Sequence, residues 1–376
     1  MQITRIEIFT IGIPFKRKYV HAEARRDAAE NIVVQIHSDT GETGIGETIP
    51  REYLTGETPG LVVEAICGTF GPQLVGVRLD SFEGTLGFLS EMVEMAHERA
   101  LEAAFCAVDL ALIDLAGKHF RRPASDAIGE VSRKKIYYTG PISGEGPLST
   151  AKTALKLKLA CFSQVKVKVG VGSDTVRLAL VRGIMGSKVD IRVDANCAWR
   201  PEQAVENISR MKRWRISSIE QPVPGKDFEG MRFVRRRCGI PVMADESICS
   251  LSDAQLLAEM GACDIFNVRL AKCGGITGSL RILEIARRNS LKYQLGCLVG
   301  ETSILAAAGR AFAFAVPELM HVEGSYNRFL LSADIATPHL GFGPNGVATP
   351  LEGFGLGVTI DEKALEKCTI DRRVLE

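Results

Sequence analysis

The sequence predicts an α/β fold, a (β/α)8-type (TIM-like) barrel with an N-terminal α+β capping domain that the C-terminal tail completes. Five short apolar runs with a charged residue at or near their end follow one another, at residues 164–169, 189–194, 216–220, 241–245 and 265–272. The charged residues recur at nearly equal steps: 26 residues from Lys168 to Asp194, 26 to Glu220, 25 to Asp245 and 27 to Lys272. One strand, one helix and two short loops fill such a step. Equal steps therefore indicate a repeated βα unit.

Three further apolar runs bring the number of expected barrel strands to eight. They lie at residues 136–138, 293–297 and 319–322. Helix-start residues follow several of the strands: Ser173-Asp174, Pro201-Glu202 and Ser252-Asp253. Eight parallel strands with helices between them favour a closed barrel over an open doubly wound sheet.

The residues outside this repeat predict a second domain, because a chain of 376 residues exceeds one ordinary core. Alternating apolar residues predict antiparallel strands at 2–12, 31–37 and 45–47, with an irregular basic loop at 16–26 between the first two. A helical period follows over residues 61–115. The expected parts are a capping domain at 1–125, a barrel at 126–340 and a C-terminal segment at 341–376 that packs back on the capping domain.

Composition and charge exclude several classes of protein. The formal net charge is +1, so we expect no nucleic-acid partner. The ten cysteines are scattered singly without a CxxC pair, which is typical of reduced thiols in a cytoplasmic protein. Met1 leads directly into a predicted strand and no apolar run reaches the length of a membrane span. We expect a cytoplasmic enzyme with a small-molecule substrate and no membrane partner.

Three carboxylates fall where successive barrel strands end. Asp194, Glu220 and Asp245 would converge at the carboxyl edge of the barrel, where catalytic groups of such barrels lie. Their mutual repulsion requires a cation among them. Oxygen ligands without a nearby His or Cys favour Mg²⁺, with Mn²⁺ as a substitute. The triplet therefore predicts a metal site.

Lysines flank this triplet in the sequence. Lys166 and Lys168 are separated by one residue, so on a strand they project from the same face, toward the inside of a barrel. Two neighbouring ammonium groups beside a divalent metal each find the protonated form disfavoured, which lowers a lysine pKa toward that of a general base. Lys272, from across the barrel, would approach the same point. A base on each side of a metal-bound carboxylate suits removal of the proton on the adjacent carbon, with the metal stabilising the enolate.

Five motifs together resemble the enolase superfamily, in the subgroup of muconate lactonizing enzymes and dipeptide epimerases. They are Lys166-x-Lys168, Val-Asp194-Ala-Asn196, Ile-Glu220-Gln-Pro222, Met-Ala-Asp245-Glu246 and Asn267-Val-Arg-Leu-Ala-Lys272-Cys-Gly-Gly275. The resemblance implies that Asp194, Glu220 and Asp245 bind Mg²⁺, that Lys168 and Lys272 are the acid/base pair, and that Lys166 tunes Lys168. The use of a lysine base with Mg²⁺ is a known property of this superfamily. The resemblance also implies a homo-oligomer, a dimer or an octamer.

The resemblance leaves the reaction open. We expect an isomerase that abstracts a proton α to a carboxylate, foremost an epimerase or racemase of a dipeptide or N-acyl amino acid. A muconate-type cycloisomerase (lactonizing) and an o-succinylbenzoate-synthase-like dehydratase are alternatives within the family. A barrel that only binds a carboxylate ligand, without catalysis, is the alternative of another class.

Residues outside the five motifs are expected to choose the substrate. Dipeptide epimerases carry Asp-x-Asp after the eighth strand to hold the substrate ammonium, whereas this chain has His321-Val-Glu323 there. In the segment of the seventh strand, Glu301 stands one residue later than in muconate enzymes. The predicted substrate-binding residues are Arg25, Arg26, Tyr53, Cys297, Glu301, His321 and Glu323.

Overall fold

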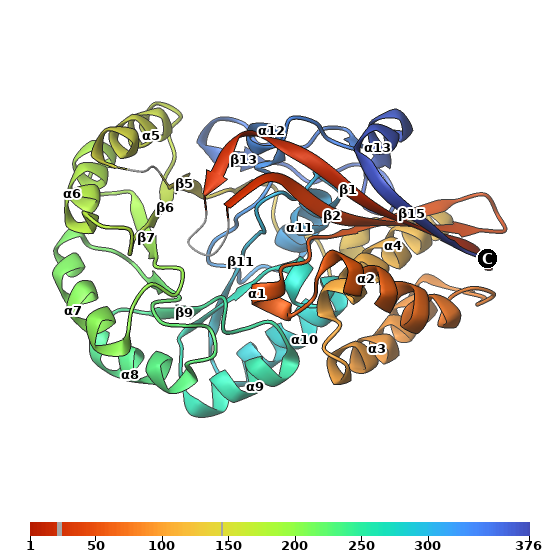
Figure 1. The fold of residues 1–376 in the computed structure, drawn as a ribbon, viewed down its shortest axis with the longest axis horizontal. Helices are drawn as coiled ribbons and strands as arrows, with labels where there is room; N and C mark the ends of the chain where they lie inside the picture. Colours follow the sequence, from red (N-terminus) through yellow and green to blue (C-terminus); the bar gives the residue numbers. More distant parts are fainter. Residues whose placement is uncertain (21–24, 144–145) are drawn as a thin grey trace.

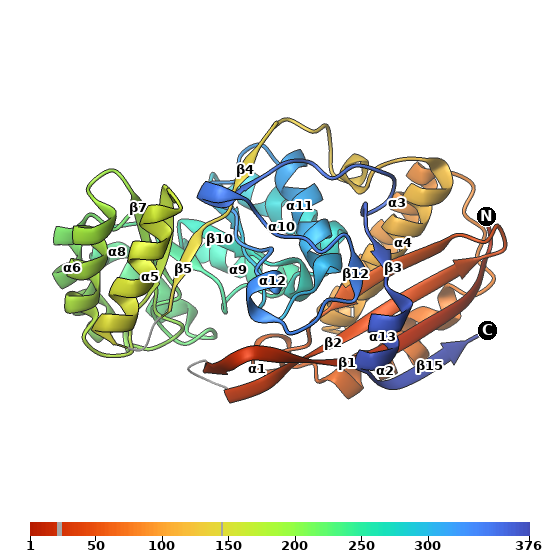
Figure 2. The ribbon, with the colours of Figure 1, turned by 90° about the horizontal axis from the view of Figure 1, so that it is seen from above.

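A computed structural model of the chain describes residues 1–20, 25–143 and 146–376, without the side chains of 17–20, 25 and 26. A barrel ringed by helices lies beside a sheet packed on helices (Figures 1 and 2). This arrangement confirms the predicted fold class. The proposed division at residues 125 and 340 stays a prediction.

The capping domain is built on a four-stranded antiparallel sheet. Its order is β15 (Thr369–Leu375), β1 (Ile3–Val20), β2 (Arg25–Ser38) and β3 (Thr43–Thr48). The C-terminal strand β15 thus extends the sheet beside β1, and Ile6 pairs with Leu375. The prediction of an irregular loop over 16–26 was wrong for the described residues, because β1 and β2 continue as a paired hairpin in which Tyr19 opposes Arg26. Backbone pairing with a partner strand outweighs the basic composition of this segment.

Helices cover this sheet, and one is buried along most of its length. α4 (Glu102–Phe120) lies against β3, where a Cβ at Gly46 would come within 1.9 Å of the Ala107 carbonyl oxygen. Glycine is therefore required for this approach. The neighbouring helices are α1 (Glu52–Thr55), α2 (Pro59–Ala65) and α3 (Phe82–Glu98), and α13 (Glu362–Cys368) precedes β15.

Seven parallel strands form the barrel sheet in chain order. They are β5 (Gly140–Ile142), β6 (Gln164–Lys168), β7 (Asp190–Asp194), β8 (Ile219–Glu220), β9 (Val242–Ala244), β10 (Ile265–Val268) and β11 (Lys292–Leu295). Val322 closes the circle, because it bridges to Leu295 on one side and to Tyr138 on the other. The predicted eighth strand is thus reduced to a single bridging residue.

The first barrel strand was predicted four residues too early. β5 is the strand that pairs with β6, whereas β4 (Ile136–Tyr137) pairs antiparallel with β13 (Val347–Ala348) of the tail. Gly140 explains the position of β5, since a Cβ there would come within 2.9 Å of the Leu157 side chain. The tail also contains a second small pair, β12 (Ala336–Thr337) with β14 (Thr359–Ile360).

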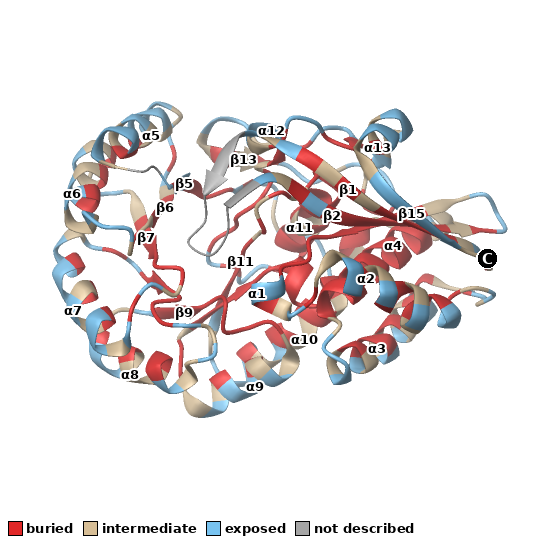
Figure 3. Ribbon diagram, viewed as in Figure 1, coloured by how far each residue is buried: buried red, intermediate tan, exposed pale blue. Residues whose placement is uncertain are grey.

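A ring of helices surrounds the strands. Their buried sides face the barrel and their exposed sides face outward (Figure 3). They are α5 (Pro147–Leu159), α6 (Asp174–Met185), α7 (Pro201–Met211), α8 (Phe228–Cys238), α9 (Leu251–Met260), α10 (Gly275–Arg288) and α11 (Ser303–Ala315), with the short α12 (Asn327–Leu330) after the last barrel residue. None of the helices in the described ranges is long and apolar enough to cross a membrane.

Candidate active site

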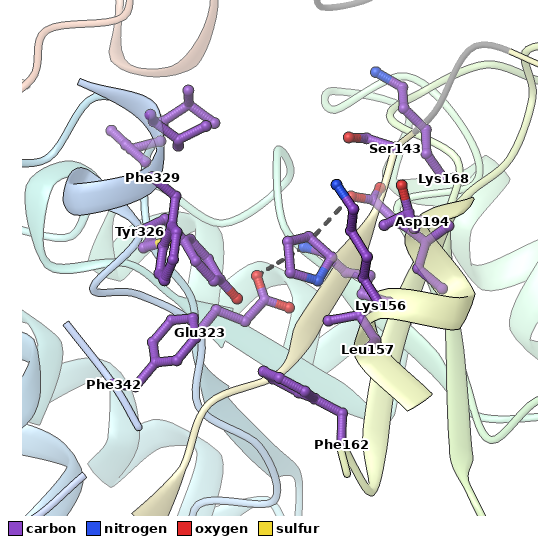
Figure 4. A pocket seen from close by; sticks show the side chains of 18 of the residues that line it. Ser143, Lys156, Leu157, Phe162, Lys168, Asp194, Glu323, Tyr326, Phe329 and Phe342 are labelled. Carbon is purple, nitrogen blue, oxygen red and sulfur yellow. Dashed lines mark hydrogen bonds and ion pairs between the residues drawn. The ribbon is translucent and has the colours of Figure 1, made fainter. Parts of the chain in front are cut away.

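A cavity of about 680 Å³ opens at the carboxyl ends of the barrel strands. Figure 4 shows two kinds of lining. Lys168 and Asp194 lie on one side. Together with Lys166 and Arg269, which also line the cavity, they form what we call the polar wall. Tyr326, Phe329 and Phe342 lie on the other side, and Phe162 lies lower in the view; we call these four rings the aromatic wall.

The three predicted metal ligands come together at one edge of the sheet. Strand pairing places Lys168 opposite Asp194 and Asp194 opposite Glu220, and Asp245 directly follows β9. All three carboxylates are buried, with exposed fractions of 7%, 1% and 0%. The equal spacing in the sequence therefore corresponds to a cluster in space.

Burial and mutual repulsion act on the protonation of this cluster. Burial raises the pKa of Asp194, and Lys166 opposes that rise while Asp245 adds to it. Burial also raises the pKa of Glu220 well above its usual value, although Lys166 again acts against it. For Asp245, burial is outweighed by Arg269 and Lys272, which hold its pKa below the usual value. The cluster needs positive charge to stay ionised.

Lys166 supplies part of that charge. Its Nζ lies 2.7 Å from Glu323 Oε2, 3.3 Å from Glu220 Oε1 and 3.5 Å from Asp194 Oδ2. Burial opposes its charge, but Glu220, Glu323 and Asp194 outweigh burial and raise the pKa of Lys166 well above its usual value. The expectation that Lys166 and Lys168 both have a lowered pKa beside a divalent metal stays a prediction for Lys166, whose pKa the surrounding carboxylates raise.

Lys168 has the opposite environment. Its Nζ makes no hydrogen bond or ion pair with any residue in the described ranges, and Figure 4 shows the side chain at the cavity. Burial lowers the pKa of Lys168 and Lys166 lowers it further, while Asp194 and Glu246 act in the other direction. A lysine with a lowered pKa beside a cavity is suited to act as a general base.

Lys272 lies behind the carboxylates rather than on the cavity surface. It sits in a 3₁₀ turn (Leu270–Lys272) after β10 and is completely buried. Its Nζ donates to the backbone oxygens of Asp245, at 2.6 Å, and of Ile248, and lies 3.4 Å from Asp245 Oδ1. Burial opposes its charge, but Asp245 helps to outweigh burial and the pKa of Lys272 is raised. Lys166 thus contacts Glu220 and Asp194, whereas Lys272 contacts Asp245.

The donor set fits a hard divalent cation. Glu220 Oε2 and Asp245 Oδ1 are buried and accept no hydrogen bond within the described part of the chain, although the Lys272 ammonium lies 3.4 Å from Asp245 Oδ1. Only oxygen ligands are present, which suits Mg²⁺. Among the described residues no three acidic, His or Cys side chains are drawn together closely enough to hold an ion as they stand. Lys166 and Arg269 lie between the carboxylates, and Arg269 pairs with Asp245 and lies 3.5 Å from Glu220.

The structure brings some of the predicted substrate-binding residues to the cavity. Tyr53, Cys297 and Glu323 line it. Arg25 and Arg26 belong to β2 rather than to a loop, and their side chains lie outside the described part of the chain.

Two predicted substrate-binding residues do not line this cavity. His321 Nε2 lies 2.7 Å from Asp190 Oδ2, and Asp190 begins β7 at the opposite end from Asp194. Glu301 turns its carboxylate back to the Leu298 backbone N–H, at 2.6 Å. Alternation along a strand explains His321, since residues two apart share a face but lie at different depths of the barrel.

Sequence reasoning missed several polar residues of the site. Glu246 is buried, accepts from Asn196 Nδ2 at 3.2 Å, and has a pKa raised to about 8 by burial, Asp245 and Asp194. Asn267 Nδ2 donates to Glu220 Oε1 at 2.9 Å. Each stands within one of the motifs, and Glu246 directly follows the expected ligand Asp245, so these positions were the available signal. Arg192, two residues before Asp194, was overlooked although charge inside a buried strand is unusual.

The aromatic wall was also not predicted. Phe342 is its centre, with ring centroids 5.2 Å from Phe329, 5.9 Å from Tyr326 and 6.0 Å from Phe162. Phe329 remains 56% exposed at the rim. A large apolar side chain left exposed beside an apolar cavity is typical of a ligand-binding surface.

Comparison with known families covers most of the chain. The family described as mandelate racemase / muconate lactonizing enzyme, N-terminal domain, matches residues 5–129, and the family described as enolase C-terminal domain-like matches residues 149–364. The chain belongs to the enolase superfamily. Within it, the matches place this member in the muconate lactonizing enzyme subgroup, which confirms the resemblance seen in its motifs.

Individual relatives of this enolase-superfamily member are isomerases. The hydrophobic dipeptide epimerase of Enterococcus faecalis is 31% identical over 84% of this chain and 88% of its own length. The N-succinyl Arg/Lys racemase of Bacillus cereus has a crystal structure with a TM-score of 0.89 and 26% identity, covering 100% of both chains. An E. faecalis dipeptide epimerase solved with Mg and L-Leu-L-Tyr has a TM-score of 0.87 and 28% identity, covering 96% of this chain and 100% of its own. The present chain is accordingly an isomerase of this superfamily, an enzyme rather than a binding protein.

Proposed function

We propose that this isomerase performs a 1,1-proton transfer, racemising or epimerising an N-acyl amino acid at the carbon next to its carboxylate. One observation carries the proposal: lysines flank the buried carboxylates from two sides, and Lys168 reaches the cavity with a lowered pKa. A dehydration begins with the same proton abstraction. A lactonizing cycloisomerisation instead forms the enolate by adding a carboxylate oxygen to a C=C bond and ends with protonation of the carbon, so the alternatives differ in how the enolate forms or reacts.

Asp194, Glu220 and Asp245 would hold Mg²⁺, and Mn²⁺ would substitute for it. Bound there, the metal would supply Lewis-acid stabilisation of the negative charge that develops on the substrate carboxylate. Glu220 Oε2 and Asp245 Oδ1, which are buried and accept no hydrogen bond within the described part of the chain, support this assignment. The relative solved with Mg and a dipeptide supports it independently.

The lysines would move the protons. Neutral Lys168 takes the α proton, so a C–H bond breaks and an N–H bond forms. The Lys272 ammonium then gives a proton to the opposite face of the same carbon. For this step Lys272 must turn from the backbone oxygens of Asp245 and Ile248 toward the cavity. The lowered pKa of Lys168 and the raised pKa of Lys272 match this assignment of base and acid.

The contacts of Glu323 favour a substrate with a neutral N-acyl group over a substrate with a free ammonium. Its Oε2 lies 2.7 Å from Lys166 and its Oε1 lies 3.2 Å from Arg192, so both oxygens already face a cation. A substrate ammonium would have to displace one of them. The aromatic wall, in contrast, offers an apolar surface, so we infer that the acyl group or the amino-acid side chain is large and apolar.

Exchange of the α proton in D₂O tests the function. The enzyme with Mg²⁺ would be incubated with an N-benzoyl and an N-acetyl amino acid and with a free dipeptide of the same side chain, and deuterium followed by mass spectrometry. We expect deuterium in the N-acyl compounds, fastest in the N-benzoyl one. Exchange in the dipeptide alone would contradict the N-acyl assignment. If none of these compounds exchanged and the enzyme consumed muconate in a parallel incubation, the cycloisomerase alternative would be favoured.

A further inference from the structure

A buried polar network crosses the barrel beneath the proposed metal ligands. Arg192 on β7 is 1% exposed, and its guanidinium donates to Thr139 Oγ1 at 2.6 Å, to Gln294 and to Glu323 Oε1 at 3.2 Å. These partners come from three other parts of the barrel wall. A buried guanidinium with several acceptors is held in one orientation, and it fixes the carboxylate that it binds.

Glu323 is the meeting point of this network with the polar wall. Its exposed fraction is 4%, and its second oxygen accepts from Lys166 at 2.7 Å. The same ammonium is farther from Glu220, at 3.3 Å, and from Asp194, at 3.5 Å. Glu323 is therefore the carboxylate nearest to Lys166, although Glu323 is not among the expected metal ligands.

We propose that Glu323, fixed by Arg192, is a positioning residue that takes the shortest contact of the Lys166 ammonium and so limits its approach to Glu220 and Asp194, which leaves these carboxylates able to take a divalent cation. The inference rests on the proposed function, since it assumes the metal site. Without Glu323, the Lys166 ammonium would satisfy its charge at the two ligand carboxylates. It would then compete with the metal for the same oxygens.

Metal binding by the Glu323→Gln variant provides the main test. The amide keeps the size of the side chain but removes the charge that attracts Lys166. We expect the Kd for Mn²⁺, measured by titration without substrate, to rise about tenfold, which is the lower end for residues that orient metal ligands. An unchanged Kd would overturn the inference. If the wild-type protein binds no Mn²⁺, the proposed metal site itself fails, and that outcome is distinct.

Removal of Lys166 tests the competition directly. Lys166→Met eliminates the ammonium, so we expect Mn²⁺ to bind at least as tightly as in the wild-type protein. Adding Glu323→Gln in this background should then change the Kd less than twofold, because nothing is left for Glu323 to hold. A tenfold loss in both backgrounds would show that Glu323 acts by another route. If Glu323→Gln does not fold, Lys166→Met alone still tests the inference. Weaker Mn²⁺ binding in Lys166→Met than in the wild-type protein would overturn the inference.

A second pair of residues, one layer deeper in the barrel on the segments that carry Arg192 and Glu323, provides a matched control. Asp190 stands two residues before Arg192 and His321 two residues before Glu323, and they pair at 2.7 Å. Asp190→Asn removes one charge of this neighbouring cross-barrel pair without reaching Lys166. We expect it to leave the Kd for Mn²⁺ unchanged. An equal loss in Asp190→Asn would assign the effect to general loosening of the barrel and overturn the positioning role.

Discussion

The two walls of the cavity differ in how they are built. The polar wall comes mostly from strand ends that recur at even steps, and charged neighbours surround most of its side chains, as Glu323 does for Lys166. The aromatic wall comes from irregular segments, and Phe329 remains exposed. The difference suggests that the polar wall carries the chemistry shared by the superfamily, whereas the aromatic wall selects the substrate.

Substitution of the lysines should give the largest effect on turnover. A small effect would contradict the assignment of the chemistry to the polar wall. Lys168→Ala is expected to lower kcat about 10² to 10⁴-fold, because the general base is lost. Lys272→Ala should lower kcat to a similar extent. If each lysine serves one face, the two variants will retain residual deuterium exchange with opposite enantiomers. Circular dichroism would check that both variants fold.

Lys156→Ala is the matched control for Lys168→Ala. Lys156 lines the same cavity but projects from α5 rather than from a strand end. Its removal should affect kcat at least tenfold less than removal of Lys168. Equal losses would mean that positive charge in the cavity, rather than a placed base, supports turnover.

The aromatic wall should respond in KM rather than in kcat. Phe329→Ala and Phe342→Ala each remove apolar contact, and loss of a buried phenyl group corresponds to about 1.5–3 kcal/mol, or roughly 10 to 100-fold in KM, when the contact is complete. We expect about a tenfold rise with an N-benzoyl substrate and little change with an N-acetyl one. Steady-state kinetics on both substrates would measure the split.

Phe354→Ala serves as the control for these aromatic substitutions. Phe354 is similarly exposed, at 48%, but does not line the cavity. It should leave the KM of both substrates unchanged. If Phe329→Ala lowered kcat and left KM unchanged, the separation between the two walls would be wrong.

The smallest effect on turnover is expected from a substitution where the capping domain contacts the barrel. Asp109 of α4 accepts from the backbone N–H groups of Ile276, at 2.7 Å, and Thr277, at 3.3 Å, at the start of α10. Burial raises the pKa of Asp109 to about 7. The native protein therefore keeps a proton that the unfolded chain releases near pH 4, so this group's contribution to stability falls as pH rises from about 4 to about 7.

Asp109→Asn tests this pH dependence. The amide preserves the acceptor for the two N–H groups and can donate to the Thr277 hydroxyl, but it does not titrate. We expect the free energy of unfolding to fall less steeply between pH 4 and 7, by up to roughly 4 kcal/mol relative to the wild-type protein, because each pKa unit corresponds to about 1.4 kcal/mol. Urea unfolding at several pH values would measure the slope. An identical slope would mean that Asp109 is ionised throughout.

Much of the fold and part of the site could be predicted from the sequence. The five strands that end near Lys168, Asp194, Glu220, Asp245 and Lys272 were placed to within a few residues because parallel strands repeat at regular steps. The first strand was misplaced, since an apolar run such as 136–138 does not reveal whether its partner is the barrel or the tail. The homo-oligomer remains a prediction.

The sequence by itself determined that three carboxylates and two lysine positions would share one edge of a barrel, because residues that end consecutive parallel strands must meet there. Only the tertiary structure decided how these groups divide their roles. Lys166 and Lys168 are two residues apart, yet three carboxylates raise the pKa of one while burial lowers the pKa of the other. The aromatic wall likewise joins residues 162, 326, 329 and 342, whose contacts depend on packing in three dimensions and follow no period along the chain.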